Sequence, residues 1–156
     1  MNITFRKAVE DDKESINNLF IEMVKTVNKR MIKDGIEPYK ELENGYNGEI
    51  DKFFDNDDFF IYVACDDDKV IGFLSICVFK DLDYIYLDDY SVSDKYRGLG
   101  IGSKLMEMAF KYVEDNNIST IQTHVESANH ESREFYKKRG FSLVSEEGHR
   151  LLIKRW

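Results

Sequence analysis

A strand, a glycine-rich turn, a helix and a second strand follow one another between residues 84 and 125, and this succession limits the possible folds most. The segments 84–92 and 118–125 carry the β-branched and aromatic side chains of strands. Between them, residues 103–113 have apolar side chains at helical spacing. A helical crossover between two strands of one sheet lets them lie parallel, whereas hairpins join antiparallel strands. The sequence therefore predicts a sheet with at least one parallel pair.

Further strands and helices are predicted on both sides of this unit. Acidic turns at 66–69 and 81–83 separate apolar runs of strand length, which predicts an antiparallel meander before the glycine-rich turn. Apolar residues recur at helical spacing from Ile16 to Met31 and again after Pro38. The predicted strands are 3–7, 59–65, 70–79, 84–92, 118–125, 141–145 and 149–154, and the predicted helices are 13–34, 39–54, 103–114 and 132–139. This order, βααβββαβαββ, describes an α/β (α+β) fold with a mixed central sheet flanked by helices.

The chain is predicted to form one domain over residues 1–156. Its length lies within the ~100–200 residues of a typical domain, and no repeat or linker interrupts it. The 22 Lys and Arg against 30 Asp and Glu give a net charge of −8, which disfavours nucleic acid as a partner. No segment has the ~20 apolar residues that span a bilayer, and the first residues lack the apolar core of a signal peptide. We therefore expect a cytoplasmic protein that does not contact membranes.

The cysteines and histidines predict neither a disulfide nor a metal site. Cys65 and Cys77 lie in apolar strand segments without the paired spacing of a disulfide framework, so we expect buried free thiols. His124, His130 and His149 are scattered and lack the spacing of metal ligands. We place His130 and His149 on the surface, and His124 in a strand or a substrate pocket.

The glycine-rich turn is the clearest candidate for a binding site. Residues 97–103 read RGLGIGS and deliver the chain into the start of a helix. Glycines let a ligand approach the backbone, and the unpaired N–H groups of a first helical turn attract anions. The spacing fits neither a P-loop, GxxxxGK[ST], nor the dinucleotide motif, GxGxxG. From the residues alone, the turn is either an anion site or simply a tight loop.

Two spaced motifs resemble those of one enzyme family. The turn resembles the RxxGxG signature of the GNAT N-acetyltransferases, and Asn129, Phe135-Tyr136 and Gly140-Phe141 resemble the family's NxxxxxFYxxxGF run. Ser132 stands where the family has Ala. The resemblance implies the GNAT fold and acetyl-CoA as cosubstrate, with its pyrophosphate on the turn and its pantetheine arm along the preceding strand. The cofactor-binding residues implied in this way are Tyr90, Ser91, Val92, Arg97, Gly98, Leu99, Gly100, Ile101, Gly102, Ser103, Asn129 and Ser132.

Acetylation of an amine requires a general base and a general acid. An alkylammonium has a pKa of about 10 and must lose a proton before its nitrogen attacks a thioester. By the two-residue period of a strand, Asp88 shares a face with Tyr90 and Val92, which predicts a carboxylate beside the acetyl group. We expect Asp88 to act as the base through a bridging water, the alternative being a solvated surface carboxylate. Tyr136 matches the family's general acid, the alternative being a core aromatic residue.

A closer resemblance concerns the acceptor. Residues 86–103 and the segments FYKKRG and SEEGHR resemble those of the spermidine/spermine (diamine) N-acetyltransferases. This resemblance implies a small cationic amine, most of all a polyamine or diamine, as substrate, bound by Asp88, Gln122, His124 and Glu147, and a homodimer. The chain has Thr26-Val27 where that subfamily has a Tyr-Glu pair. The alternative acceptors are an aminoglycoside, a small amino compound, and a protein lysine or N-terminus. A non-catalytic acyl-CoA-binding sensor is the alternative outside the enzymes.

Overall fold

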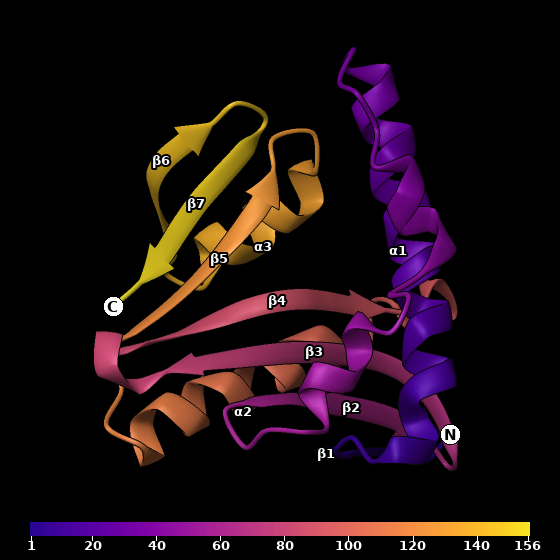
Figure 1. Ribbon diagram of the computed structural model, residues 1–156, viewed down its shortest axis with the longest axis vertical. Coiled ribbons are helices and arrows are strands. Elements are labelled where there is room, and N and C mark those ends of the chain that lie inside the picture. The colour runs from indigo at the N-terminus through magenta and orange to yellow at the C-terminus, as the bar shows by residue number, and fades with distance from the viewer.

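The computed structural model describes residues 1–156 and contains one seven-stranded sheet of order β1-β2-β3-β4-β5-β7-β6 (Figure 1). Only β4 and β5 pair in parallel, as the crossover predicts, and every other neighbouring pair is antiparallel. The strands are β1 (Ile3–Lys7), β2 (Phe59–Asp66), β3 (Lys69–Phe79), β4 (Tyr84–Val92), β5 (Thr120–Glu126), β6 (Ser142–Glu147) and β7 (Arg150–Arg155). The α-helices are α1 (Lys13–Lys33), α2 (Ile101–Asp115) and α3 (His130–Lys138). The predicted fold class is confirmed.

The helices cover the two faces of the sheet because each has one apolar side. Ile16, Phe20 and Val24 of α1 pack with β2 and β3 on one face. Leu105 and Met106 of α2 are fully buried on the opposite face, in a cluster that also holds α3 and the inner side chains of β5 and β7. Both cysteines are buried and free. No helix is both long enough and apolar enough to cross a bilayer.

The prediction of an α-helix after Pro38 is wrong. The segment instead forms two short 3-10 helices, η2 (Lys40–Asn44) and η3 (Glu49–Phe53). Gly45, Asn47 and Gly48, which lie between them, all have positive φ angles. An α-helix cannot continue through such left-handed residues, so the chain turns there. Ile50 and Phe53 are nevertheless buried against the α1 face of the sheet.

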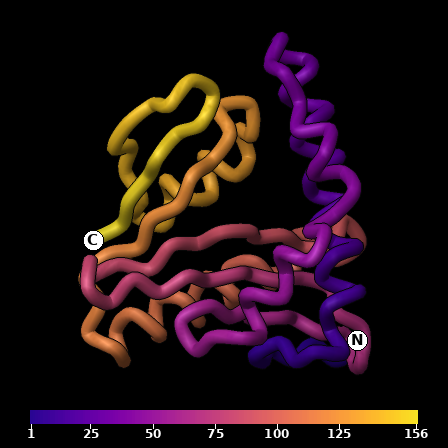
Figure 2. The backbone as a smooth tube through the Cα atoms, viewed as in Figure 1, coloured from indigo at the N-terminus to yellow at the C-terminus, as the bar shows by residue number.

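The sheet opens between β4 and β5. Their pairing covers only residues 84–87 of β4 and 120–123 of β5, and beyond it the two strands diverge (Figures 1 and 2). Ser93 N–H donates to Ile71 of β3 at 2.8 Å. Because N–H directions alternate along a strand, the N–H of Val92 points the other way, into the gap. This gap therefore exposes backbone donors in the middle of the sheet.

A β-bulge lies in β4 just where the strands diverge. Leu87 pairs with Ile76 and Tyr90 with Leu74, so two residues of β4, Asp88 and Asp89, face the single residue Ser75. The buried Ser75 hydroxyl accepts from the Asp89 N–H at 2.8 Å, which satisfies a backbone group that the bulge removes from the ladder.

The bulge makes the predicted side-chain alternation of β4 wrong between Asp88 and Tyr90. Tyr90 and Val92 pack in the cluster beneath α2, together with the inner side chains before the bulge. The carboxylates of Asp88 and Asp89 instead contact the 46–52 segment on the α1 side of the sheet. Asp88 therefore does not share a face with Tyr90 and Val92, because the extra residue shifts the two-residue period by one.

Candidate active site

Two adjoining cavities lie beside the gap between β4 and β5. The larger has a volume of about 460 Å³ and is bounded by α1, β4, β5 and α3. The smaller, of about 380 Å³, is bounded by the glycine-rich turn, the start of α2, α1 and α3. The side chains that border both are Met23, Val27, Tyr90, Asn129 and Ser132. The two cavities therefore meet at Tyr90, and a ligand bound in one can reach into the other.

The glycine-rich turn gives the smaller cavity an exposed helix start. Gly98 and Gly100 have φ angles of +79° and +77°, and no atom lies within 4 Å of the Cβ positions that side chains would add there. Gly100 is the N-cap of α2 and provides no side chain to cap it. The N–H groups of the first turn of α2 are therefore left for another acceptor, and their partial positive charge favours an anion.

Arg139 strengthens the positive character of this helix start. Its guanidinium donates to the hydroxyl of Ser103 at 2.5 Å and lies 3.6 Å from the centre of the Phe135 ring. Both Arg139 and Arg97 line the smaller cavity. Arg139 was not among the residues predicted from the sequence, although a basic residue at the end of the last helix was a visible signal. Leu99, by contrast, was predicted to bind the cofactor but is exposed and outside both cavities.

A buried polar atom at the junction of the cavities has no protein partner. The hydroxyl of Tyr90 is inaccessible to solvent and makes no hydrogen bond. A Cβ on Gly102 would lie 2.5 Å from this oxygen, so only glycine leaves room for it at the start of α2. Buried hydroxyls are seldom left unpaired. The uncapped helix start fits a cofactor that carries a phosphate, and the unpaired Tyr90 hydroxyl fits a cofactor whose polar groups lie along the edge of β4.

The larger cavity is lined by a pair of adjacent carboxylates. Asp89 accepts a hydrogen bond from the Tyr46 hydroxyl at 2.7 Å, and Asp88 lies 4.0 Å from the Lys52 ammonium. Loss of contact with water, together with the neighbouring charge of Asp88, raises the pKa of Asp89 to about 7. Loss of contact with water also raises the pKa of Asp88, while Lys52 acts in the opposite direction. At neutral pH the pair can therefore hold or release a proton.

Asp89→Asn is expected to raise the midpoint of thermal unfolding at about pH 8. The folded chain keeps the Asp89 proton up to about pH 7, whereas the unfolded chain loses it near the ordinary value of 3.8. The folded state binds more protons between these values, so stability falls as the pH rises through this window. Asn removes the charge and can still accept from Tyr46. Thermal melts at about pH 4.5 and 8 test this, and the same pH dependence in wild type and variant would contradict it.

Tyr136 brings a buried hydroxyl to the same cavity from α3. Its ring packs edge-on against Phe135 and Phe141, with centroids 5.7 and 5.1 Å away. Burial raises the pKa of the hydroxyl above its ordinary value of 10.0. The hydroxyl therefore stays protonated at neutral pH and is available as a donor. The alternative interpretation, a core aromatic residue, describes its ring correctly but not its place in the cavity wall.

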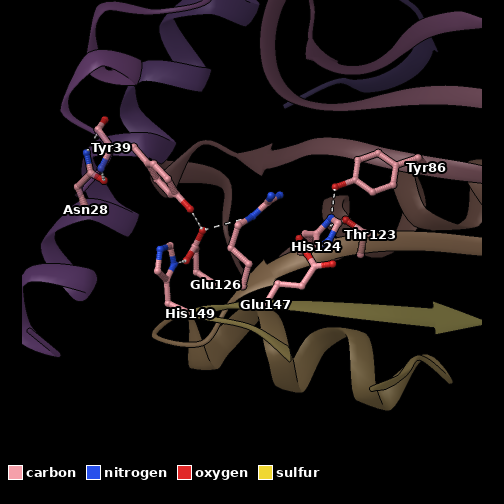
Figure 3. A network of polar contacts seen from close by, with 9 residues as sticks. Asn28, Tyr39, Tyr86, Thr123, His124, Glu126, Glu147 and His149 are labelled. Carbon is pink, nitrogen blue, oxygen red and sulfur yellow. Dashed lines mark hydrogen bonds and ion pairs between the residues drawn. The ribbon is translucent and has the colours of Figure 1, made fainter. Parts of the chain in front are cut away.

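Tyr39 and Glu126, which line the larger cavity, belong to a polar network that the sequence did not predict (Figure 3). Glu126 accepts from the Tyr39 hydroxyl at 2.5 Å, and its second oxygen lies 2.5 Å from Nδ1 of His149. The side chain of Asn28 binds both the N–H and the carbonyl of Tyr39. These contacts fasten the segment after α1 to the end of β5. His149, expected on the surface, is only partly exposed because of this contact.

Of the four predicted substrate residues, two line the larger cavity and two do not. Asp88 and His124 border it. Glu147 is largely exposed and pairs with Nε2 of His124 at 2.9 Å, while Nδ1 of that ring lies 2.6 Å from the Tyr86 hydroxyl (Figure 3). Gln122 is paired with Tyr86 inside the sheet and borders neither cavity. No group of three or more His, Cys, Asp or Glu side chains is arranged to hold a metal ion.

Comparisons with known proteins agree with this geometry. Residues 23–141 match the model of the acetyltransferase (GNAT) family. The chain is 38% identical over 61 residues to the protein of Drosophila melanogaster described as probable N-acetyltransferase san, a match that spans 38% of this chain and only 33% of that protein.

The solved structures share the fold over nearly the whole chain. The PaiA N-acetyltransferase of Thermoplasma acidophilum, solved with coenzyme A, gives a TM-score of 0.80 at 21% identity over 99% of each chain. An acetyltransferase of the GNAT family from Staphylococcus aureus gives 0.75 at 16% identity, over 99% of this chain and 98% of that one. At these identities the likeness concerns the fold.

Proposed function

This chain belongs to the acetyltransferase (GNAT) family, and we propose from that membership that it transfers the acetyl group of acetyl-CoA to a primary amine. The observation that carries the proposal is the meeting of the two cavities at Tyr90. One cavity has an uncapped helix start for phosphates, and the other has carboxylates and a protonated tyrosine. Donor and acceptor can therefore approach each other at the open edge of β4.

The smaller cavity is the proposed cofactor site. The N–H groups at the start of α2, with Arg97 and Arg139 beside them, provide the positive potential that a pyrophosphate needs. The N–H of Val92 points into the gap, where it can donate to a carbonyl oxygen of the donor and to the negative charge that develops on it. Acetyl-CoA supplies the activated acyl group, and these residues hold and orient it.

In the larger cavity, Asp88 is the proposed base. At neutral pH its neighbour Asp89 retains a proton for part of the time, because its pKa is about 7. Asp88, about a third exposed, keeps contact with water and in its ionised form can accept the ammonium proton, directly or through water. Tyr136 is the proposed acid, because its buried, protonated hydroxyl can donate to the leaving thiolate.

The proposed acceptor is a small cationic amine, with a polyamine as the first candidate. Three carboxylates line the larger cavity, those of Asp88, Asp89 and Glu126, against the single guanidinium of Arg150. This balance favours cations, and the net charge of −8 acts in the same direction at long range. Glu126 takes the place that the sequence assigned to Glu147. The apolar side chains of α1, including Val27, offer a surface for the methylene groups of such an amine.

Gly100→Asp is expected to weaken acetyl-CoA binding by about 10-fold or more, roughly 1.4 kcal/mol. The position has a positive φ angle, which strains any side chain, and the new carboxylate would stand at the start of α2 where the phosphates bind. Isothermal titration calorimetry without an acceptor measures the affinity. Gly148→Asp, in the β6–β7 turn and also at positive φ, is the matched control. Equal affinity in wild type and Gly100→Asp would remove the proposed cofactor site.

A further inference from the structure

A carboxylate lies between two arginines at the edge of the smaller cavity. Oε2 of Glu131, in the first turn of α3, is 3.2 Å from Nη2 of Arg30 and 3.5 Å from Nη1 of Arg97. All three residues line the cavity that contains the start of α2. Arg30 comes from α1, and Arg97 is the first residue of the glycine-rich turn. Three separate parts of the chain therefore converge on one anionic group.

Each arginine is also held by a second neighbour. Nη1 of Arg30 donates to Oδ1 of Asn129 at 2.6 Å, and Nε of Arg97 lies 3.0 Å from Asp94. Glu131, in contrast, has no other ion pair or side-chain hydrogen bond, and its side chain is 69% exposed. Ion pairs as exposed as this contribute little to stability. Arg30 is thus held by Asn129 and Arg97 has a second carboxylate partner in Asp94, whereas Glu131 can leave both arginines at small cost.

We propose that Arg30 and Arg97 form a binding site for a phosphate group of the cofactor, and that Glu131 holds this site until the cofactor displaces it. The 3′-phosphate of CoA and its pyrophosphate each carry more negative charge and more acceptor oxygens than a single carboxylate, which suits two guanidinium forks. The inference rests on the proposed use of acetyl-CoA. It adds a residue of α1, Arg30, to the cofactor site and makes Glu131 an internal competitor of the cofactor.

Glu131→Gln is therefore expected to strengthen the binding of CoA, although it changes a side chain that lines the cavity. The gain is about 3-fold in affinity, since weakly held ion pairs no longer have to be broken. Arg30→Gln is expected to weaken binding by about 5-fold, because one phosphate contact is lost. Calorimetry with CoA alone measures both effects without any acceptor or turnover, and thermal melts check that each variant is folded.

Matched controls separate these effects from a general change of charge. Glu134→Gln makes the same change one turn later on α3, outside both cavities, and Lys29→Gln removes a positive charge from α1 beside Arg30. Both should leave the affinity for CoA unchanged. If Glu131→Gln binds CoA as weakly as the wild type, or more weakly, Glu131 does not compete with the cofactor and the inference is wrong.

A second ligand, 3′-dephospho-CoA, distinguishes the phosphates. If Glu131→Gln improves binding of CoA only, the 3′-phosphate occupies the site. If Glu131→Gln improves the binding of both ligands, the pyrophosphate occupies the site. Either result supports the role of Glu131 as a competitor. Failure of the proposed use of acetyl-CoA has a different signature, because then the wild type binds neither ligand. A wild type that binds CoA, and loses binding in Gly100→Asp, with no gain in Glu131→Gln, contradicts the inference alone.

Discussion

Tyr136→Phe is expected to lower turnover by about 100-fold while leaving the affinity for acetyl-CoA almost unchanged. Phe keeps the ring contacts with Phe135 and Phe141, so the packing of α3 is preserved. Only the hydroxyl is lost, and burial keeps it protonated in the wild type because its pKa is raised. A donor that acts mainly as the thiolate leaves changes kcat rather than ground-state binding.

Steady-state kinetics together with calorimetry test this prediction. Tyr112→Phe is the matched control, because Tyr112 is a partly buried tyrosine of α2 that borders neither cavity. The control should keep full turnover. If the turnover of Tyr136→Phe lies within about 2-fold of the wild type, Tyr136 has only a packing role and is not the general acid.

Asp88→Asn is the second change with a large expected effect, about 100-fold or more in turnover. Asn is close in shape but cannot accept the proton that the ammonium must lose. The wild-type rate should fall toward acid pH, and the midpoint of this fall should lie above the ordinary carboxyl pKa of 3.8, because loss of contact with water raises the pKa of Asp88. The variant should lack this acidic limb.

The pH profile of kcat, measured on a good acceptor, distinguishes a base from a residue that only attracts cations. Asp81→Asn, in the exposed turn before β4, removes the same charge outside both cavities and should behave as wild type. If Asp88→Asn raises KM but leaves kcat and its acidic limb unchanged, Asp88 binds the acceptor and does not take its proton.

Hydrophobic periodicity predicted most of the fold because it acts over short stretches of chain. The α1 and α2 patterns, and the crossover from β4 to β5, needed only local spacing and the handedness of connections. The prediction of a second helix, after Pro38, failed for a local reason as well. Its apolar residues have helical spacing, but Gly45 and Gly48 adopt left-handed backbone that ends a helix. The two glycines within the predicted helix could have indicated that it ends there.

The site was predictable where a motif defines it and not where long-range contacts do. The glycine-rich turn, Asn129 and Tyr136 follow from local motifs, and all of these residues except Leu99 line a cavity. The bulge at Asp88 and Asp89 depends on Ser75 of a neighbouring strand, and no pattern within β4 shows it. Contacts such as Tyr39 with Glu126, or Arg30 with Glu131, join residues about 90 to 100 positions apart, so only the folded chain shows them.

Acetyl transfer to an amine is tested by an acceptor screen that follows the release of free CoA from acetyl-CoA. The amines are spermidine, spermine, putrescine, thialysine, kanamycin and a basic peptide, and mass spectrometry identifies the acetylated product. We predict amine-dependent release with spermidine and spermine, reduced about 100-fold in Tyr136→Phe. Release with only the peptide or kanamycin would exclude the polyamine acceptor and leave acetyl transfer intact. If none of the six amines releases CoA faster than the reaction without amine, the proposed acetyl transfer to a primary amine is wrong.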